Sequence, residues 1–199
     1  MGPSASRSRP AKPGCAGCAW VLASFSKIED HRVQGARCQK FGTIARTDHR
    51  EWYRELFETC VVSGLIPASA LAGYRNDAIY LRKSRYVPPR WETVRDAMTA
   101  LFDLLDAEPE SSVRAVLGHW LSGYTRPYPD SNGRMARFLM NVLLASGRYP
   151  RTVVCVEDRA EYLKALDRAS IDADAKPFAR FIAERVRWSL KKTKRSLRA

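Results

Sequence analysis

Apolar residues recur at helical spacing along most of the chain, and this pattern predicts a mainly α-helical protein. The clearest stretch follows residue 111, where apolar residues fall at i, i+3, i+4, i+7, i+8 and i+11, namely Val113, Val116, Leu117, Trp120, Leu121 and Tyr124. Similar stripes predict further helices that begin near residues 48, 91, 134, 159 and 177. We expect these helices to enclose a common core.

Four of the other predicted helices also carry an apolar stripe that we expect to be buried. The stripes expected to be buried are Val94, Met98, Leu101, Leu104 and Leu105 in the helix from 91, Met135, Phe138, Leu139, Val142 and Leu143 in the helix from 134, Tyr162, Leu163 and Leu166 in the helix from 159, and Phe178, Phe181, Ile182 and Val186 in the helix from 177. Each stripe is wide enough to cover one side of a bundle helix.

Two segments between the helices have non-helical patterns. Residues 125–133 read TRPYPDSNG, and two prolines with Asp, Ser, Asn and Gly predict an ordered loop. Residues 77–89 place two short β-prone runs around a polar centre and end in two prolines. We therefore expect a small β-hairpin, called the flap below, between the first two helices.

The length and composition of the chain bound its organisation. A chain of 199 residues with 45% hydrophobic residues supports one domain with a substantial core. Residues 1–24 are rich in Ser, Pro, Gly, Ala and Arg without periodicity, which predicts a disordered leader. We place the domain at 25–189 and a basic C-terminal tail at 190–199.

The net charge of +13 and the pI near 9.9 favour an acidic partner without choosing one. No run approaches the roughly 18 apolar residues of a membrane helix, and we expect a cytoplasmic protein that does not bind membranes. Five scattered cysteines fit reduced thiols better than a disulfide framework, and the Cys15/Cys18 pair lacks the further ligands of a zinc site.

The junction between the 125–133 loop and the next helix holds the candidate chemistry. Arg134 and Arg137 lie three residues apart in the first turn, where cations oppose the helix dipole unless an anion compensates. Together with free backbone N–H groups of the turn 131–133, they predict a phosphate-binding nest. Asp130 could hold Mg²⁺ beside such phosphates. The alternative is that Asp130 caps the helix and both arginines pair with surface acids.

The stretch 126–137 (RPYPDSNGRMAR) resembles the Fic (Fido) motif H-P-F-x-[DE]-[AG]-N-G-R-x-x-R. The flanking segments FLMN at 138–141, YVPP at 86–89, and Tyr162 to Leu166 followed by Pro177-Phe178 are similar to the family as well. The resemblance covers roughly residues 50–187. It implies a helical domain in which the flap lies beside the active-site loop. Such a domain would bind ATP and Mg²⁺ and transfer AMP to a hydroxyl of a target protein.

The resemblance also implies roles for individual residues. Asp130 would bind the metal, and Arg137 would reach the terminal phosphate of the nucleotide. The α- and β-phosphates would lie against the turn made of Ser131, Asn132, Gly133 and Arg134. The flap residues Ala78, Ile79, Tyr80 and Leu81 would hold the target backbone by strand addition. Tyr162 would lie beside the adenine, or else it is an ordinary core aromatic.

One position departs from the family in a way that affects chemistry. The catalytic histidine, which takes the proton from the attacking hydroxyl, corresponds to Arg126, and an arginine stays protonated and cannot act as that base. Losing a general base typically costs 10²- to 10⁴-fold in rate, while phosphate and metal binding can persist. Ser131 also stands where the family has Ala or Gly, which adds a side chain close to the phosphates.

Regulation and partners follow from the same resemblance. Many family members carry an inhibitory helix whose glutamate pairs with the second arginine of the motif, and the stretch 25–30 (FSKIED) offers Glu29 as a weak candidate against the alternative of an ordinary surface acid. A separate inhibitory partner is the other arrangement. Two functions remain open: a slow protein adenylyltransferase, and a non-catalytic module that binds nucleotide or target. Nucleic acid is an unlikely partner because the aromatic residues are not interleaved with a continuous basic patch.

Overall fold

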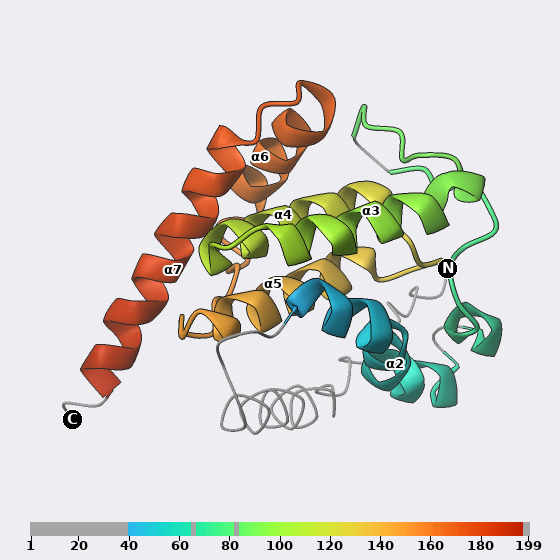
Figure 1. Cartoon of the computed structure of the whole chain (residues 1–199), viewed down its shortest axis with the longest axis horizontal. Coiled ribbons are helices and arrows are strands. Elements are labelled where there is room, and N and C mark those ends of the chain that lie inside the picture. Colours follow the sequence, from blue (N-terminus) through green and yellow to red (C-terminus); the bar gives the residue numbers. More distant parts are fainter. Residues whose placement is uncertain (1–39, 65–66, 82–83, 197–199) are drawn as a thin grey trace, which may run out of the picture.

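The structure is a computed structural model that describes residues 40–64, 67–81 and 84–196 of the chain, and these residues form mainly α-helices (Figure 1). The elements are α2 (Phe41–Val62), the 3₁₀ helices η1 (Ala68–Leu71) and η2 (Trp91–Thr93), α3 (Val94–Ala107), α4 (Ser111–Thr125), α5 (Asn132–Ser146), α6 (Arg159–Ile171) and α7 (Lys176–Ser196). The predicted leader, the Cys15/Cys18 pair and Glu29 lie outside the described residues. The mainly helical fold class is confirmed.

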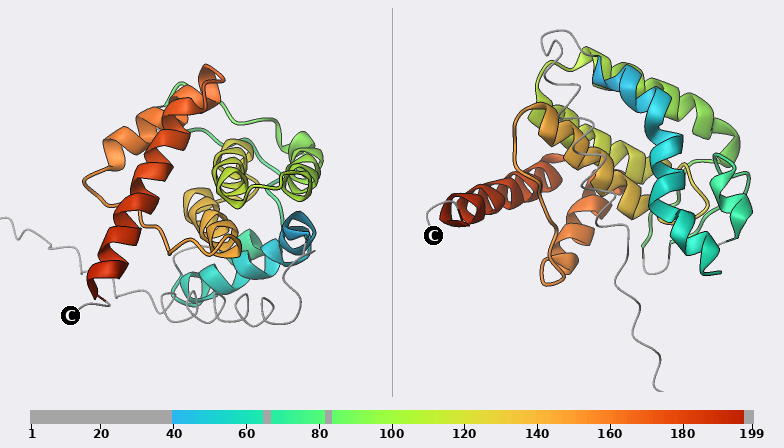
Figure 2. Two further views of the ribbon diagram at one scale, coloured as in Figure 1. Left: turned by 60° about the vertical axis from the view of Figure 1, so that its left-hand side comes forward. Right: turned by 90° about the horizontal axis from the view of Figure 1, so that it is seen from below.

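The antiparallel helices α4 and α5 form the centre of the molecule. Figure 2 shows α2 and α3 on one side of this pair, and α6 and α7 on the other. The closest packing joins α4 to α5, and α3 and α6 also contact α4. Since a short loop joins the end of α4 to the start of α5, the predicted motif lies at one end of the central pair.

The buried face of α4 differs from the predicted one. The residues that are buried are Ala115, Gly118, His119, Ser122 and Thr125, whereas Val113 is 41% exposed and the other predicted core residues are only partly buried. The reason is close approach to α5, because a Cβ atom added at Gly118 would lie 2.5 Å from the Leu143 side chain. Small residues therefore face the partner helix, and the larger apolar residues pack along the sides of α4.

The apolar stripes of α5 and α7 are confirmed as core. All of the predicted core residues in these two helices are at most 8% exposed, namely Met135, Phe138, Leu139, Val142, Leu143, Phe178, Phe181, Ile182 and Val186. In α3 the prediction was wrong for Leu104, which is 40% exposed, and the neighbouring Phe102 is buried instead. Leu163 in α6 is likewise 43% exposed.

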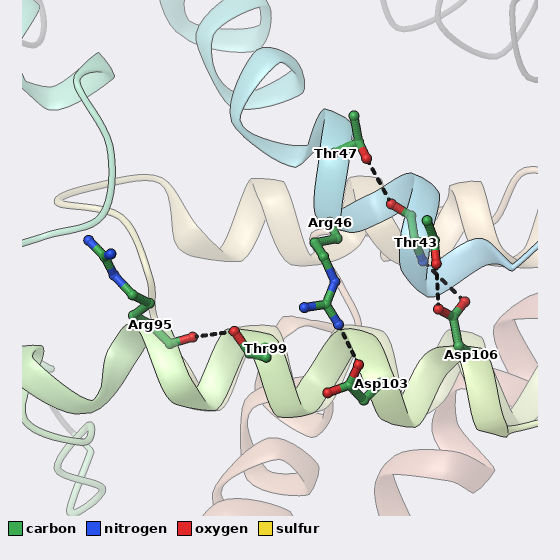
Figure 3. Close-up of polar contacts among 7 residues, drawn as sticks. All are labelled: Thr43, Arg46, Thr47, Arg95, Thr99, Asp103 and Asp106. Carbon is green, nitrogen blue, oxygen red and sulfur yellow. Dashed lines mark hydrogen bonds and ion pairs between the residues drawn. The ribbon is translucent and has the colours of Figure 1, made fainter.

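Helices α2 and α3 are joined by polar contacts as well as by apolar packing (Figure 3). The carboxylate of Asp106 accepts hydrogen bonds from the backbone N–H of Thr43 at 3.1 Å and from its hydroxyl at 2.7 Å. A carboxylate at this position compensates the free N–H groups and the dipole at the start of α2. Arg46 pairs with Asp103 one turn further along both helices.

Some helix boundaries differ from the predicted ones. Helix α2 begins at Phe41 rather than near Asp48, and α5 begins at Asn132 rather than near Arg134. Helix α7 continues to Ser196, so most of the expected basic tail is helical. Among the described helices, none is long and apolar enough to cross a membrane.

The flap segment 77–89 is extended but carries no strand within its described residues, 77–81 and 84–89. One backbone hydrogen bond joins its two sides, from the N–H of Ser84 to the carbonyl of Leu81 at 3.5 Å. A single bond does not make a ladder, so the β-hairpin stays a prediction. The segment nevertheless runs beside the end of α4, because the Tyr86 hydroxyl donates to the carbonyl of Tyr124 at 2.8 Å.

Candidate functional site

The loop between α4 and α5 is bounded by two residues in the left-handed conformation. Arg126, with φ 48°, ends α4, and Ser131, with φ 61°, precedes α5. Such angles are uncommon for residues with a side chain and persist where the surroundings enforce them. The loop is thus held in a specific shape by contacts beyond its own sequence.

A reciprocal pair of hydrogen bonds braces the loop from within. The side-chain oxygen of Asn132 accepts from the backbone N–H of Tyr128 at 2.9 Å, and its amide nitrogen donates to the Tyr128 carbonyl at 2.7 Å. Asn132 is only 3% exposed. Because both polar atoms of this side chain are used inside the loop, a phosphate contact by Asn132 would involve its backbone N–H.

The underside of the loop rests on aromatic residues of α2. The ring of Tyr128 stacks on Tyr53 with 3.7 Å between centroids, and its hydroxyl donates to the carbonyl of His49 at 3.0 Å. The Tyr53 hydroxyl in turn donates to the carbonyl of Asp130 at 3.3 Å. Burial, followed by the charge of Asp130, raises the pKa of Tyr53 to about 12, so its proton stays available for this bond.

The start of α5 presents donors and cations. The carbonyl of Ser131 accepts from the N–H groups of Arg134 and Met135, while the N–H groups of Asn132 and Gly133 precede these bonds and have no acceptor within the helix. Among the described residues, neither Arg134 nor Arg137 forms an ion pair with a carboxylate. A site with free N–H groups and two uncompensated arginines can bind an anion.

The alternative interpretation of this junction does not match the geometry. The N-cap residue of α5 is Ser131, which makes no side-chain capping bond. The carboxylate of Asp130 is exposed and accepts from the adjacent N–H of Ser131 at 2.6 Å. Arg134 lies over the ring of Phe57, with 5.8 Å to the centroid, and not against a surface acid.

Arg126 lies where the loop, the flap and α6 meet. Burial lowers the pKa of its guanidinium, and the hydroxyls of Tyr162 and Tyr86 act in the opposite direction. Its Nε atom is buried and has no hydrogen-bond partner among the described residues. A partly buried, incompletely paired cation therefore stands at the first position of the motif, and nothing in its surroundings makes it a proton acceptor.

Tyr162 is part of the core between α4, α6 and α7. It is 5% exposed, and its hydroxyl lies 3.0 Å from Nε2 of His119. Arg137 also acts on this hydroxyl and opposes the rise in the Tyr162 pKa that burial causes. Tyr162 thus lies next to the second arginine of the motif, and its contact with adenine stays a prediction.

The flap residues that were expected to dock a target lie partly at the surface. Tyr80 is 79% exposed and Ala78 is exposed, whereas Ile79 and Leu81 are half-buried. Alternate side chains thus differ in exposure, as they do in an extended segment with one covered face. Their role in target docking stays a prediction.

Arg75 was not predicted as a site residue, yet it holds the flap and the loop together. Its backbone N–H donates to the Pro127 carbonyl at 2.8 Å, and its Nε donates to the carbonyl of Arg126 at 2.8 Å. The side chain is only 4% exposed. No local pattern in the sequence signals such a residue, because these partners are backbone carbonyl groups about fifty positions away.

An open cavity of about 850 Å³ borders the loop on the side of α2 and η2. Its lining includes Pro129 from the loop, Asp77 at the start of the flap, and two arginines, Arg50 and Arg95. The guanidinium of Arg50 lies 4.8 Å from the ring centre of Tyr74. The cavity connects the flap to the motif loop and has space for part of another molecule.

The residues of the site do not form a metal centre on their own. Among the described residues, no group of three or more His, Cys, Asp or Glu side chains could hold a metal ion. Mg²⁺ is usually held by one or two carboxylates together with substrate phosphates and water. Asp130, as a single exposed carboxylate beside a turn with free N–H groups, fits that second arrangement.

Two buried histidines near the site predict loss of stability in acid. Burial lowers the pKa of His119 to about 3 and that of His49 to about 4, whereas both would titrate near 6.5 when unfolded. The unfolded chain then binds more protons below pH 6.5, so each histidine should lower the unfolding free energy by about 1.4 kcal/mol per pH unit between pH 6.5 and about 4. Urea unfolding at pH 7, 6 and 5 measures this loss.

NMR titration of the His119 and His49 rings provides the control for that experiment. Both rings should remain neutral at pH 5, because burial lowers both pKa values and, at His49, outweighs the opposite effect of the carbonyls of Ala45 and Arg46 that face its Nδ1 atom. Rings that protonate near pH 6.5, or a stability that stays flat down to pH 5, would contradict the assignment.

Comparison with known proteins gives the relatives of this chain. A family model described as Fic/DOC matches residues 43–144, which is just over half of the 199 residues and includes the loop and most of α5. The chain is 36% identical over 114 residues to protein adenylyltransferase Fic of Nematostella vectensis, a match that covers 55% of this chain and 26% of that protein. It is 31% identical over 114 residues to protein adenylyltransferase fic-1 of Caenorhabditis elegans, covering 55% of this chain and 22% of that protein. The chain thus spans about a quarter of the length of these curated relatives.

Solved structures agree on the fold. The fragment 134–508 of Fic-1 from Caenorhabditis elegans superposes with a TM-score of 0.73 at 21% identity, over 96% of this chain and 55% of that one. A Fic domain containing signaling protein from Bacteroides thetaiotaomicron gives a TM-score of 0.67 at 20% identity, over 88% of this chain and 69% of that one. The predicted Fic-type helical arrangement is therefore confirmed.

Proposed function

Because the chain belongs to the Fic/DOC family, we propose that its helical domain binds ATP at the start of α5 and is built to transfer AMP to a hydroxyl of a target protein. The observation that carries the proposal is the shape of the 126–131 loop, which leads into a helix N-terminus with free N–H groups and two arginines that pair with no carboxylate among the described residues. The choice of ATP and of AMP transfer rests on the relatives that are named protein adenylyltransferases.

The residues of the loop would divide the work of holding the nucleotide. The N–H groups of Asn132 and Gly133 would face phosphate oxygens, and Arg134 and Arg137 would neutralise their charge. A Cβ atom at Gly133 would meet only the Arg137 guanidinium, at 3.5 Å, so the backbone there is open to close approach. Asp130 would hold Mg²⁺, which would supply positive charge beside the phosphates.

The transfer itself requires a proton acceptor that Arg126 does not provide. The target hydroxyl oxygen would form a bond to the α-phosphorus of ATP, the bond to pyrophosphate would break, and the hydroxyl proton would have to leave. We propose that Arg126 stands at the position of the family's general-base histidine. The proton must then pass to water or to a phosphate oxygen, and the reaction should be slow.

The same residue supports a second candidate function. A cation beside the phosphates would stabilise bound nucleotide without promoting transfer, which describes a nucleotide- or target-binding module. The buried Nε of Arg126 has no partner among the described residues and is compatible with this alternative, because an anion placed in the site could accept its hydrogen bond. Binding of ATP is common to both functions, and only the transfer step separates them.

The target protein would lie against the flap and the neighbouring cavity. The described part of the flap, 77–81 and 84–89, forms no ladder with another described segment, so the backbone groups between its ends that make no hydrogen bond there would be available for strand addition. The cavity beside it is lined by Arg50 and Arg95, which favour acidic side chains in the target. This docking mode is a proposal, as are any inhibitory role of Glu29 or of a separate partner and the cytoplasmic location.

Calorimetric titration with MgATP tests the nucleotide site. We expect the parent protein to bind MgATP and the Arg137→Ala variant to bind at least about tenfold more weakly, because a charge-assisted hydrogen bond contributes about 1.5–3 kcal/mol. Arg187→Ala, on the exposed side of α7, is the matched control and should bind like the parent. No binding by the parent, or equal losses in both variants, would refute the proposed site.

A further inference from the structure

The side chain of Arg75 reaches four backbone carbonyl groups that belong to two different segments. Its guanidinium donates to Asp77 at 2.8 Å and to Pro89 at 2.5 Å, which are the two ends of the flap. It also donates to Arg126 at 2.8 Å and to Thr125 at 3.5 Å, at the end of α4. We call Arg75 and these four carbonyl groups the Arg75 junction.

The Arg75 junction is an unusual way to bury a cation. Buried arginines are normally paired with a carboxylate, but among the described residues Arg75 forms no such ion pair. Burial lowers the pKa of its guanidinium, with smaller opposite contributions from Tyr86 and Glu92. The charge is compensated by carbonyl dipoles, including those at the negative end of α4.

The geometry of the junction requires the planar fork of an arginine. Bonds leave from Nε and from both terminal nitrogens, so three nitrogens in one plane reach carbonyls on opposite sides. A lysine has one nitrogen with three donors on a flexible stem and cannot span the same set. The junction therefore fixes the distance between the flap and the motif loop.

A second contact reinforces the same connection. The Tyr86 hydroxyl donates to the Tyr124 carbonyl, so side chains from residues 75–89 bind the carbonyl groups of three consecutive residues, 124, 125 and 126. The last carbonyl groups of a helix lack partners within the helix. Here they are used to attach the flap to the residue that begins the loop, Arg126.

From this arrangement we infer that Arg75 is a positioning residue, which fixes the target-docking flap relative to the phosphate-binding loop through the Arg75 junction. It touches neither ATP nor target in this scheme. It acts by fixing the position of the flap relative to Arg126, whose backbone is left-handed. A target hydroxyl held by the flap would then face the α-phosphate of ATP. The inference deepens the proposed function and rests on it for the role of the two segments, but the mechanical coupling stands on the contacts alone.

The coupling is measured by amide hydrogen exchange in Arg75→Lys. Two reporter amides lie on the two sides: that of Tyr86, which donates to the Ser84 hydroxyl at 3.1 Å, and that of Tyr128, which donates to Asn132. Both should exchange at least about tenfold faster in the variant, while amides in the core of α5 and α6 keep the parent rates. Arg187→Lys, on the exposed side of α7, is the matched control and should keep the parent exchange rates at both reporters.

Chemical rescue distinguishes positioning from a general loss of structure. Arg75→Ala should lose the protection of both reporters, and millimolar guanidinium should restore it in part by occupying the space left by the side chain. With ATP and target, the variant should show a raised KM for the target with a smaller change in kcat, which the same guanidinium corrects.

Each experimental outcome either supports or overturns the inference about Arg75. Joint loss of protection at Tyr86 and Tyr128 with a stable core supports the Arg75 junction, even if the parent proves unable to bind ATP. A uniform loss through the whole bundle, a change on one side only, unchanged reporters in Arg75→Lys, or failure of guanidinium to restore any protection would overturn the inference.

Discussion

Replacing Arg126 by histidine should raise the rate of AMP transfer at least about 100-fold, because it would supply the general base that we propose the loop lacks. Histidine is among the residues that tolerate a positive φ, so the 48° of this position should accept it without strain. The substitution also removes the buried, unpartnered Nε of the arginine. The measurement is the amount of α-labelled ATP fixed to protein in a cell lysate with Mg²⁺, with parent and variant compared over time.

Two further variants control this experiment. Arg126→Gln removes the charge without adding a base and should label at the rate of the parent. Adding Asp130→Ala to Arg126→His should abolish the gained labelling, since the carboxylate proposed to hold Mg²⁺ would be lost. Labelling by Arg126→His and not by the parent would favour a transferase scaffold that lacks its base.

The opposite outcomes are equally informative. A parent that labels as fast as Arg126→His would mean that Arg126 does not limit transfer, and the assignment of the missing base would be wrong. If neither protein labels any target although both bind MgATP, the domain acts as a binding module. Measuring MgATP affinity on the same samples therefore separates loss of binding from loss of chemistry.

The fold could be predicted where helical periodicity coincides with the buried face. The stripes of α5 and α7 satisfy this condition, because each helix packs with one broad side against the bundle. Helix α4 does not, since it is central and approaches α5 so closely that Ala115, Gly118 and Ser122 must face its neighbours. Hydrophobic patterning favours large residues for the core and so selected the wrong face.

Candidate site residues could be proposed from the sequence where a single short stretch carries them. The loop, the turn proposed to bind phosphate and Asp130 all lie within residues 126–137 and could be interpreted together. Arg75 could not be found this way, because its partners are backbone carbonyl groups of residues 77, 89, 125 and 126, and carbonyls leave no trace in a sequence. The internal brace made by Asn132 was missed for a related reason, since the resemblance assigned this residue to phosphate.

Removing the Asn132 side chain should have the largest effect on the shape of the loop. Asn132→Ala would leave both the N–H and the carbonyl of Tyr128 unpaired, and Tyr128 is only 1% exposed. At about 1–3 kcal/mol for each of the two buried unpaired groups, the unfolding free energy should fall by about 2–6 kcal/mol. Urea denaturation measures this change, and calorimetry on the folded variant should show at least about tenfold weaker MgATP binding.

Ser131→Gly is the matched control because it changes the residue next to Asn132 and should raise the unfolding free energy rather than lower it. Ser131 has a φ of 61° and makes no capping bond with its side chain, so glycine should relieve backbone strain and raise stability by up to about 1 kcal/mol. Its MgATP affinity should equal or exceed that of the parent. A control that loses stability would show that the serine contributes a contact beyond its backbone.

Asn132→Asp separates the two halves of the brace. It keeps an acceptor for the Tyr128 N–H but places a carboxylate oxygen against the Tyr128 carbonyl, so it should be destabilised although it differs from the parent by a single donor group. If Asn132→Ala and Asn132→Asp both unfold within about 0.5 kcal/mol of the parent, as an ordinary surface substitution does, the brace does not hold the loop. If stability falls in both variants while MgATP affinity is unchanged, the brace holds the loop and the nucleotide is bound elsewhere. Only a fall in both quantities is consistent with a loop whose shape creates the phosphate site.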